Sequence, residues 1–161
     1  MLYETSKLDE LPEPKRFQVT PLIKAPLDIV LSKELYDTLN QDDLYTELTQ
    51  LKWAHTSQRP PQKFMEQIPK EFQQYFKPDG SAQYSIENAH TSLALARAGL
   101  AGTIAPRALV KEDISNGTLV RIDLAFELNL NIGAYRLRSR GINTTVQKVI
   151  TALQETDINE L

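Results

Sequence analysis

Cysteine is absent from this sequence of 161 residues. The absence excludes disulfide frameworks, thiolate zinc sites and thiol catalysis, and it is typical of proteins in a reducing cytosol. The sequence also lacks an apolar run long enough to span a bilayer, and its first residues are too polar for a signal peptide. We therefore expect a cytoplasmic protein with no membrane partner.

Blocks of like charge are missing as well. The net charge is −3, and neither a basic groove for nucleic acid nor a patch for an anionic membrane is indicated. Hydrophobic residues make up 41% of the chain and aromatic residues 7%, which is typical of a globular protein. The length suits one compact unit with a real core.

Recognisable catalytic and cofactor motifs are also lacking. The sequence has no G-x-S-x-G, no P-loop and no G-x-G-x-x-G, which argues against hydrolases, NTPases and dinucleotide enzymes. The two histidines, His55 and His90, follow neither an H-x-x-H nor an H-E-x-x-H pattern. We expect His55 to be partly buried on a strand and His90 to lie near solvent. No catalytic residue, metal ligand or cofactor is therefore expected.

Short apolar strands alternate with helical patterns along the chain. This alternation predicts a three-layer α/β fold, with helices on both faces of a mostly parallel, mixed sheet. Residues up to about Arg16 show neither helical nor strand periodicity and are expected to form a connector. The expected strands are 26–32, 52–56, 82–86, a strand after Gly99, 118–124 and 128–138; the expected helices are 44–51, 62–76, 88–100 and 143–155.

The helix expected over 88–100 begins with an unusually polar turn. Asn88 is a plausible N-cap, and His90 and Thr91 add an imidazole and a hydroxyl group to the first turn. Free backbone N–H groups and the helix dipole allow such a start to bind a carboxylate, sulfate or phosphate. The same residues also suit a purely structural cap, so the residues alone leave a ligand site and a simple cap both open.

Two further features have a structural and a functional interpretation. Trp53 is best explained as a core residue. Arg136, Arg138 and Arg140 alternate along an expected strand and so share one side of it. That side is either a solvated edge or a surface that attracts an anion or an acidic partner.

The ordered series of motifs resembles the effector-binding domain of LysR-type transcriptional regulators. Segment 85–123 carries a polar helix start, a helix end at Gly99, an apolar strand with Pro106, and a G-x-L-V pattern from Gly117. One departure is Leu100-Ala101-Gly102, where the family usually continues with a second glycine directly after the leucine. Three other segments resemble the family's entry strand, its short helix with the next strand, and its final helix: 17–35, 42–57 and 143–155.

The resemblance implies a two-lobed, periplasmic-binding-protein-like domain around a cleft. Residues 22–140 correspond to the second lobe, 1–21 to the exit segment of the first lobe, and 141–161 to a C-terminal helix that returns toward it. Nothing in the chain resembles the winged helix-turn-helix or the opening of the first lobe. The chain is thus expected to be an expressed fragment or a truncated gene product.

The resemblance also implies a function in sensing. A small, anionic effector would bind between the lobes, and the full-length protein would be a homo-oligomer that binds DNA only through a domain absent here. The effector-binding residues implied are Asn88, His90, Thr91, Thr20, Thr56 and Ser57. The alternatives are a stand-alone solute-binding protein or small enzyme with the same type of lobe, and a module that serves only oligomerisation.

Overall fold

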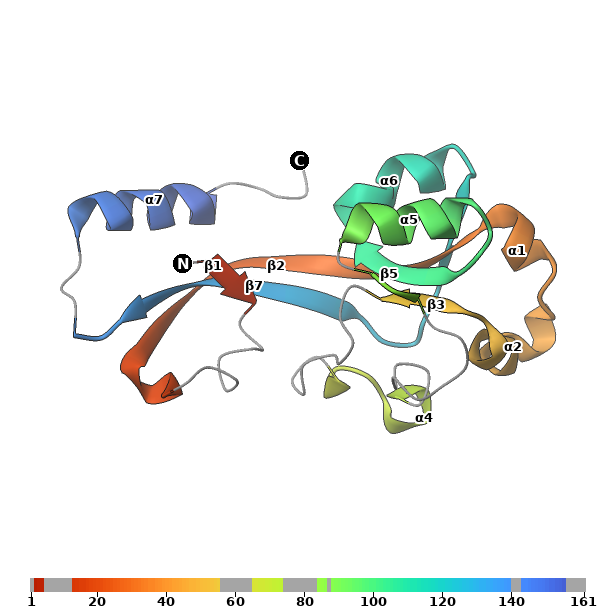
Figure 1. Ribbon diagram of the computed structural model, residues 1–161, viewed down its shortest axis with the longest axis horizontal. Helices are drawn as coiled ribbons and strands as arrows, with labels where there is room; N and C mark the ends of the chain where they lie inside the picture. Colours follow the sequence, from red (N-terminus) through yellow and green to blue (C-terminus); the bar gives the residue numbers. More distant parts are fainter. Residues whose placement is uncertain are drawn as a thin grey trace.

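Two long strands run lengthwise through the molecule and connect its two ends (Figure 1). The computed structural model describes residues 2–4, 13–55, 65–73, 84–86, 88–139 and 143–155. The long strands are β2 (Phe17–Ser32) and β7 (Leu128–Leu137), and together we call them the ribbon. Helices α5 (Ala89–Arg97) and α6 (Arg107–Ser115) lie over one end of this ribbon, and helix α7 (Thr144–Glu155) lies over the other end.

The sheet is mixed and built around β2. Its order is β1-β7-β2-β5-β3-β4, and β6 also pairs with β2. The pairs of β3 with β4 and with β5 are parallel, whereas β2 pairs antiparallel with each of its neighbours and β1 pairs antiparallel with β7. The expected α/β fold with a mixed sheet is confirmed. The remaining strands are β1 (Leu2–Glu4), β3 (Trp53–His55), β4 (Tyr84–Ser85), β5 (Gly102–Pro106) and β6 (Leu119–Ile122).

Strand β2 changes partners along its length. Leu27 pairs with Leu128 of β7 on one edge and with Pro106 of β5 on the other. Further on, β6 takes the place of β7 on the same edge, so that Ile29 pairs with Ile122. The register of β2 and β7 shifts between Pro21 and Ile23. With 16 residues, β2 is more than twice as long as the strand 26–32 that local patterning predicts.

Apolar clusters cover both faces of the sheet. Val30, Leu93 and Val110 belong to the cluster under α5 and α6, while Leu31 and Trp53 belong to the cluster on the opposite face. Figure 1 shows α2 (Leu44–Gln50) and α4 (Lys70–Gln73) on that second side, so the predicted three layers are present. Trp53 is a core residue, as predicted, and its Nε1 donates a hydrogen bond to the carbonyl oxygen of Leu48 at 3.1 Å.

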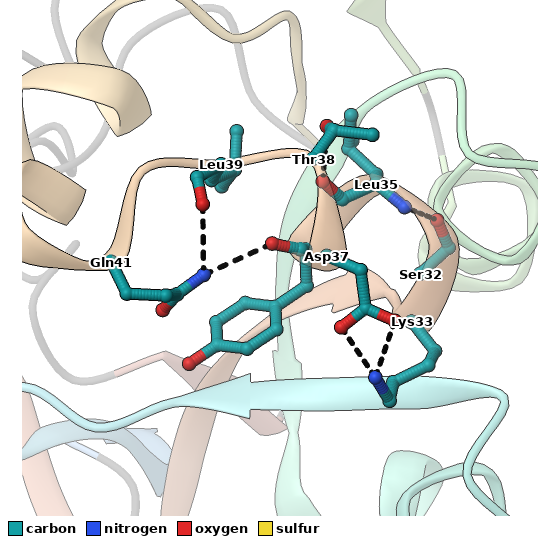
Figure 2. A network of polar contacts seen from close by, with 8 residues as sticks. Ser32, Lys33, Leu35, Asp37, Thr38, Leu39 and Gln41 are labelled. Atoms are coloured by element: carbon teal, nitrogen blue, oxygen red, sulfur yellow. Dashed lines mark hydrogen bonds and ion pairs between the residues drawn. The ribbon is translucent and has the colours of Figure 1, made fainter.

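Helix α1 (Lys33–Asp37) was not expected from the sequence, and side chains hold it at both ends (Figure 2). At its start, Oγ of Ser32 accepts a hydrogen bond from the backbone N–H of Leu35 at 3.1 Å, and Lys33 forms an ion pair with Asp37. After its end, Nε2 of Gln41 donates to the carbonyl oxygens of Tyr36 and Leu39 at 3.1 and 3.2 Å. These contacts stabilise a helix too short to persist alone.

Helix α7 begins as predicted but is only partly covered. The side chain of Asn143 accepts a hydrogen bond from the N–H of Thr145 at 2.8 Å, which confirms the expected cap. Ile150 is buried, whereas Val146 and Val149 of the same apolar stripe are 47% and 54% exposed. Within the described residues, no helix is long and apolar enough to cross a membrane.

The helix expected over 62–76 is only partly visible. Helix α4 (Lys70–Gln73) begins directly after Pro69, whose carbonyl oxygen accepts a hydrogen bond from the N–H of Gln73 at 3.1 Å. Ile68 is buried in the core. The other parts of the expected helix, 62–64 and 74–76, lie outside the described residues.

Candidate functional site

The start of α5 has the cap geometry expected from the sequence. Oδ1 of Asn88 accepts hydrogen bonds from the backbone N–H of Thr91 at 2.9 Å and from its hydroxyl at 3.1 Å. Ser92 is buried, and its hydroxyl donates to the carbonyl oxygen of Asn88 at 3.4 Å. The helix ends before Gly99, whose φ of 70° is the left-handed conformation common after a helix. Both predicted ends of α5 are therefore confirmed.

This helix start is open to solvent. Asn88, His90 and Thr91 are all exposed, so three residues proposed to contact a ligand lie together on one accessible turn. The backbone N–H groups of Ala89 and His90 form no hydrogen bond with a residue that the structure describes. Two free N–H groups beside the Thr91 hydroxyl are suitable donors for an anion.

Sheet topology explains where this turn lies. Strands β3, β4 and β5 are parallel, so their carboxyl ends share one edge of the sheet. Helix α5 follows β4 and α6 follows β5, and both therefore start at that edge, where crevices form in open α/β sheets. A bidentate ion pair between Arg97 and Asp113, with an Nη2–Oδ2 distance of 2.7 Å, ties the two helices together.

A second ion pair fixes the start of α6. Nε and Nη2 of Arg107 donate to the carboxylate of Asp28, and the Nη2–Oδ1 distance is 2.9 Å. The Asp28 side chain is only 4% exposed, whereas that of Arg107 is 50% exposed. Hydrogen bonding to Asp28 raises the pKa of Arg107 above its ordinary value, although partial burial opposes the shift. The buried carboxylate thus holds a half-exposed guanidinium in one orientation.

The ion pair between Asp28 and Arg107 was not predicted from the sequence. Two signals were available: Asp28 interrupts the apolar run 26–32, and Arg107 directly follows the proline that ends a strand. A charge inside an apolar strand usually has a partner, because an unpaired buried charge is costly. The partner is 79 residues away, however, and no local pattern identifies it.

The other proposed site residues are not brought to the α5 start. Thr20 lies in the part of β2 that pairs with Ala134 of β7. Its neighbour Pro21 accepts a hydrogen bond from Nε2 of Gln154 in α7, so Thr20 belongs to the end of the ribbon under α7. Thr56 and Ser57 lie outside the described residues. Their contacts with a ligand remain predictions.

The remaining polar candidates have structural partners or no assigned role. His90 is exposed, as predicted, and His55 occupies the last position of β3. Arg136 donates to Oε1 of Gln18, and Arg138 donates to the carbonyl oxygen of Phe17 at 3.1 Å. Arg140 lies outside the described residues. Across the part of the chain that the structure describes, no group of His, Cys, Asp and Glu could hold a metal ion.

Removing the cap of α5 should weaken the fold measurably. We expect Asn88→Ala to lower the free energy of unfolding by about 1 kcal/mol, because the N–H of Thr91 loses its acceptor. Asn88→Asp keeps an acceptor and should retain most of the stability. Urea denaturation of the three proteins measures the difference. Equal losses for alanine and aspartate would show that the cap bond contributes nothing.

Comparison with known families identifies this architecture. The model of the LysR substrate binding domain matches residues 8–157, which is nearly the whole chain. The chain belongs to the LysR substrate-binding domain family. No curated protein sequence matches it.

Solved structures of LysR-type domains share the fold of this LysR substrate-binding domain. The effector domain of AmpR from Pseudomonas aeruginosa is 20% identical, with a TM-score of 0.59 over 87% of this chain and 65% of that one. Full-length LysG from Corynebacterium glutamicum with bound effector Arg is 12% identical, with a TM-score of 0.60 over 86% of this chain and 45% of that one. The C-terminal domains of a LysR family protein from Agrobacterium tumefaciens are 14% identical, with a TM-score of 0.62 over 96% of this chain and 70% of that one.

The chain spans only part of the length of these relatives. It covers less than two thirds of the AmpR effector domain and less than half of full-length LysG. At identities of 20% or below, the likeness shows a shared fold, and ligand contacts in those proteins do not transfer residue by residue.

Proposed function

We propose that this chain is the ligand-sensing part of a LysR-type transcriptional regulator, and that it binds a small anionic effector at the start of α5. The observation that carries the proposal is the family match over residues 8–157, combined with an exposed helix start at Asn88, His90 and Thr91 whose first two N–H groups have no partner among the described residues. Binding of DNA would belong to a different part of the regulator, and the regulator would be a homo-oligomer in the cytoplasm.

The hydrogen-bonding groups at the start of α5 favour binding of an anion. The first N–H groups of a helix carry partial positive charge, and two of them, in Ala89 and His90, have no partner among the described residues. The hydroxyl of Thr91 supplies another polar group beside them, although its own hydrogen is directed at Asn88. A carboxylate or a similar oxyanion would therefore meet several donors from one short segment.

We also propose the two lobes that the resemblance to LysR-type regulators implies. Residues 22–140 would form the second effector lobe, and 1–21 with 141–161 would belong to the first. The register shift between Pro21 and Ile23 lies at this boundary. A ligand between the lobes would act by binding one lobe arrangement more tightly than the other. Thr20, Thr56 and Ser57 are the further contacts that we propose for the completed cleft.

Nuclear magnetic resonance can test the site with defined probes. We expect succinate to shift the backbone amide signals of 88–92 in a saturable manner, and its neutral analogue succinamide to do so much less. Ala89→Pro removes one of the two unpartnered N–H groups at the first helical position, which accepts proline, and should weaken succinate binding about fivefold, in line with the loss of one hydrogen bond worth about 1 kcal/mol. The matched control is Thr144→Pro, the same change at the first residue of α7.

Two results would contradict the proposed site. The first is equal shifts of the 88–92 signals with succinate and succinamide, which would exclude recognition of the negative charge. The second is the absence of saturable shifts at 88–92 with succinate, sulfate and phosphate alike, which would leave Asn88 with a capping role only.

A further inference from the structure

A separate cavity of about 480 Å³ lies beside the ribbon, under the loop that joins β6 to β7. We call it the β6–β7 pocket. Its walls come from β2, the end of β6, the loop 123–127, the start of β7 and the first residue of α6. None of its lining residues belongs to β3, β4 or α5. It is therefore distinct from the turn at Asn88, and its volume falls in the usual range for small-molecule sites.

The pocket has one charged side and one apolar side. Side chains alternate along a strand, so Lys24 and Asp28 lie on the same face of β2, the face covered by α6. Leu27 and Ile29 lie on the opposite face and pack in the core cluster there. Of the six charged residues that line the pocket, three are basic and three acidic: Lys24, Arg107, Arg121, Asp28, Asp123 and Glu127.

Two of these charged residues form no ion pair within the described part of the chain. Arg107 pairs with Asp28, and Arg121 pairs with Asp123. Lys24 and Glu127 are exposed and form no ion pair with any residue that the structure describes. The pocket thus offers one ammonium group without an ion pair, and one carboxylate whose charge acts on Arg107, a residue already paired with Asp28.

The positions of these two charged residues allow them to meet around one small ligand. Lys24 lies three residues before Leu27, and Leu27 pairs with Leu128, the residue after Glu127. Lys24 itself pairs with Asn131, four residues after Glu127, so at about 3.3 Å per residue the two backbone positions lie about 13 Å apart along the ribbon. The long side chains of lysine and glutamate can reach across most of such a span.

We propose that the β6–β7 pocket binds an α-amino acid. A simple anion would meet the carboxylates of Glu127 and Asp123, and a simple cation would meet Lys24 and Arg121. A zwitterion presents its carboxylate to Lys24 and its ammonium group to Glu127, so each of the two gains an ion pair. The partly buried side chains of Leu124 and Phe126 line the same pocket and suit an apolar amino-acid side chain.

Ligand binding here would act on the connection between the two ends of the molecule. The pocket contacts both strands of the ribbon, through Lys24 on β2 and Asn129 on β7, and also the loop from β6. An amino acid held by Lys24 and Glu127 would tie this loop to β2. The site would therefore report the concentration of an amino acid independently of the effector at α5.

The test uses the whole chain and L-leucine, followed by the amide signals of 123–129. We expect saturable shifts with L-leucine. We also expect binding about tenfold weaker or more with 4-methylpentanoate, which lacks the ammonium group, and with 3-methylbutylamine, which lacks the carboxylate. Lys24→Gln and Glu127→Gln should each weaken L-leucine binding about tenfold, since each removes one charged partner.

Matched controls separate this site from general charge effects and from the α5 site. Lys148→Gln on α7 and Glu112→Gln on α6 change the same charges on exposed positions outside the pocket, and they should leave L-leucine binding unchanged. Asn88→Ala should also leave it unchanged. The proposal is overturned if L-leucine gives no saturable shift at 123–129 up to ~20 mM, about the weakest affinity of interest. It is equally overturned if 4-methylpentanoate or 3-methylbutylamine binds as well as L-leucine.

Discussion

Gly102→Ala is expected to lower the free energy of unfolding by about 3 kcal/mol, the upper part of the range for overpacked cores. A Cβ atom at this position would lie 2.7 Å from Cδ2 of Leu31 and 2.7 Å from Cζ3 of Trp53. Both neighbours are buried, and the Trp53 ring is held by its hydrogen bond to Leu48, so neither can move aside freely. Chemical denaturation measures the loss.

Two comparisons isolate the steric cause. Gly117→Ala places a Cβ atom where nothing lies within 4 Å, at a φ of 77°, and should cost only about 1 kcal/mol through the backbone. The double variant Gly102→Ala with Leu31→Val removes the Cδ2 atom, so its loss should be smaller than the sum of the two single losses. Strict additivity would contradict the clash.

Arg107→Met is expected to lower the free energy of unfolding by about 2 kcal/mol, within the range for breaking a partly buried charged pair. Methionine keeps much of the side-chain volume but leaves the carboxylate of Asp28, which is 4% exposed, without its hydrogen-bond donors. The lost partner matters because a buried carboxylate cannot recover full hydration.

An exposed ion pair on the same side of the sheet provides the control. Arg121 and Asp123 are 44% and 84% exposed, so Arg121→Met should change the stability by less than about 0.5 kcal/mol. Adding Asp28→Asn to Arg107→Met removes the unpaired charge and should recover part of the loss. Equal effects of the Arg107 and Arg121 variants in urea denaturation would show that burial of Asp28 adds nothing to the pair.

Local chemistry explains which elements could be predicted from the sequence. The cap residues Asn88 and Asn143 and the glycine after α5 act within a few residues of their partners, so the sequence pattern contains the whole interaction. Trp53 was assigned to the core because large aromatic side chains are rarely left in water. The α/β class followed from the alternation of strands and helices.

Non-local contacts explain what could not be predicted. The first half of β2 contains Pro21 and precedes Pro26, residues that argue against a central strand. Pro21 lies at the register shift, and Pro26 lies one position before the ladder with β5 begins, so the sheet accommodates both. Helix α6 was missed because it is short and only Val110 among its nine residues is buried, so no long apolar stripe marks it. The start of α5 was predicted, whereas the ion pair of Asp28 with Arg107 joins positions with no local signal.

The paired strands β2 and β7 limit how the two ends of the molecule can move. Stretching the pair, or sliding one strand along the other, would break the backbone hydrogen bonds of the ladder that runs from the pairing of Phe17 with Leu137 to that of Leu27 with Leu128. The irregular step between Pro21 and Ile23 interrupts this series and permits local bending and twisting. We therefore expect the two ends to rotate about this step, so that a small change near it becomes a larger displacement at the tips.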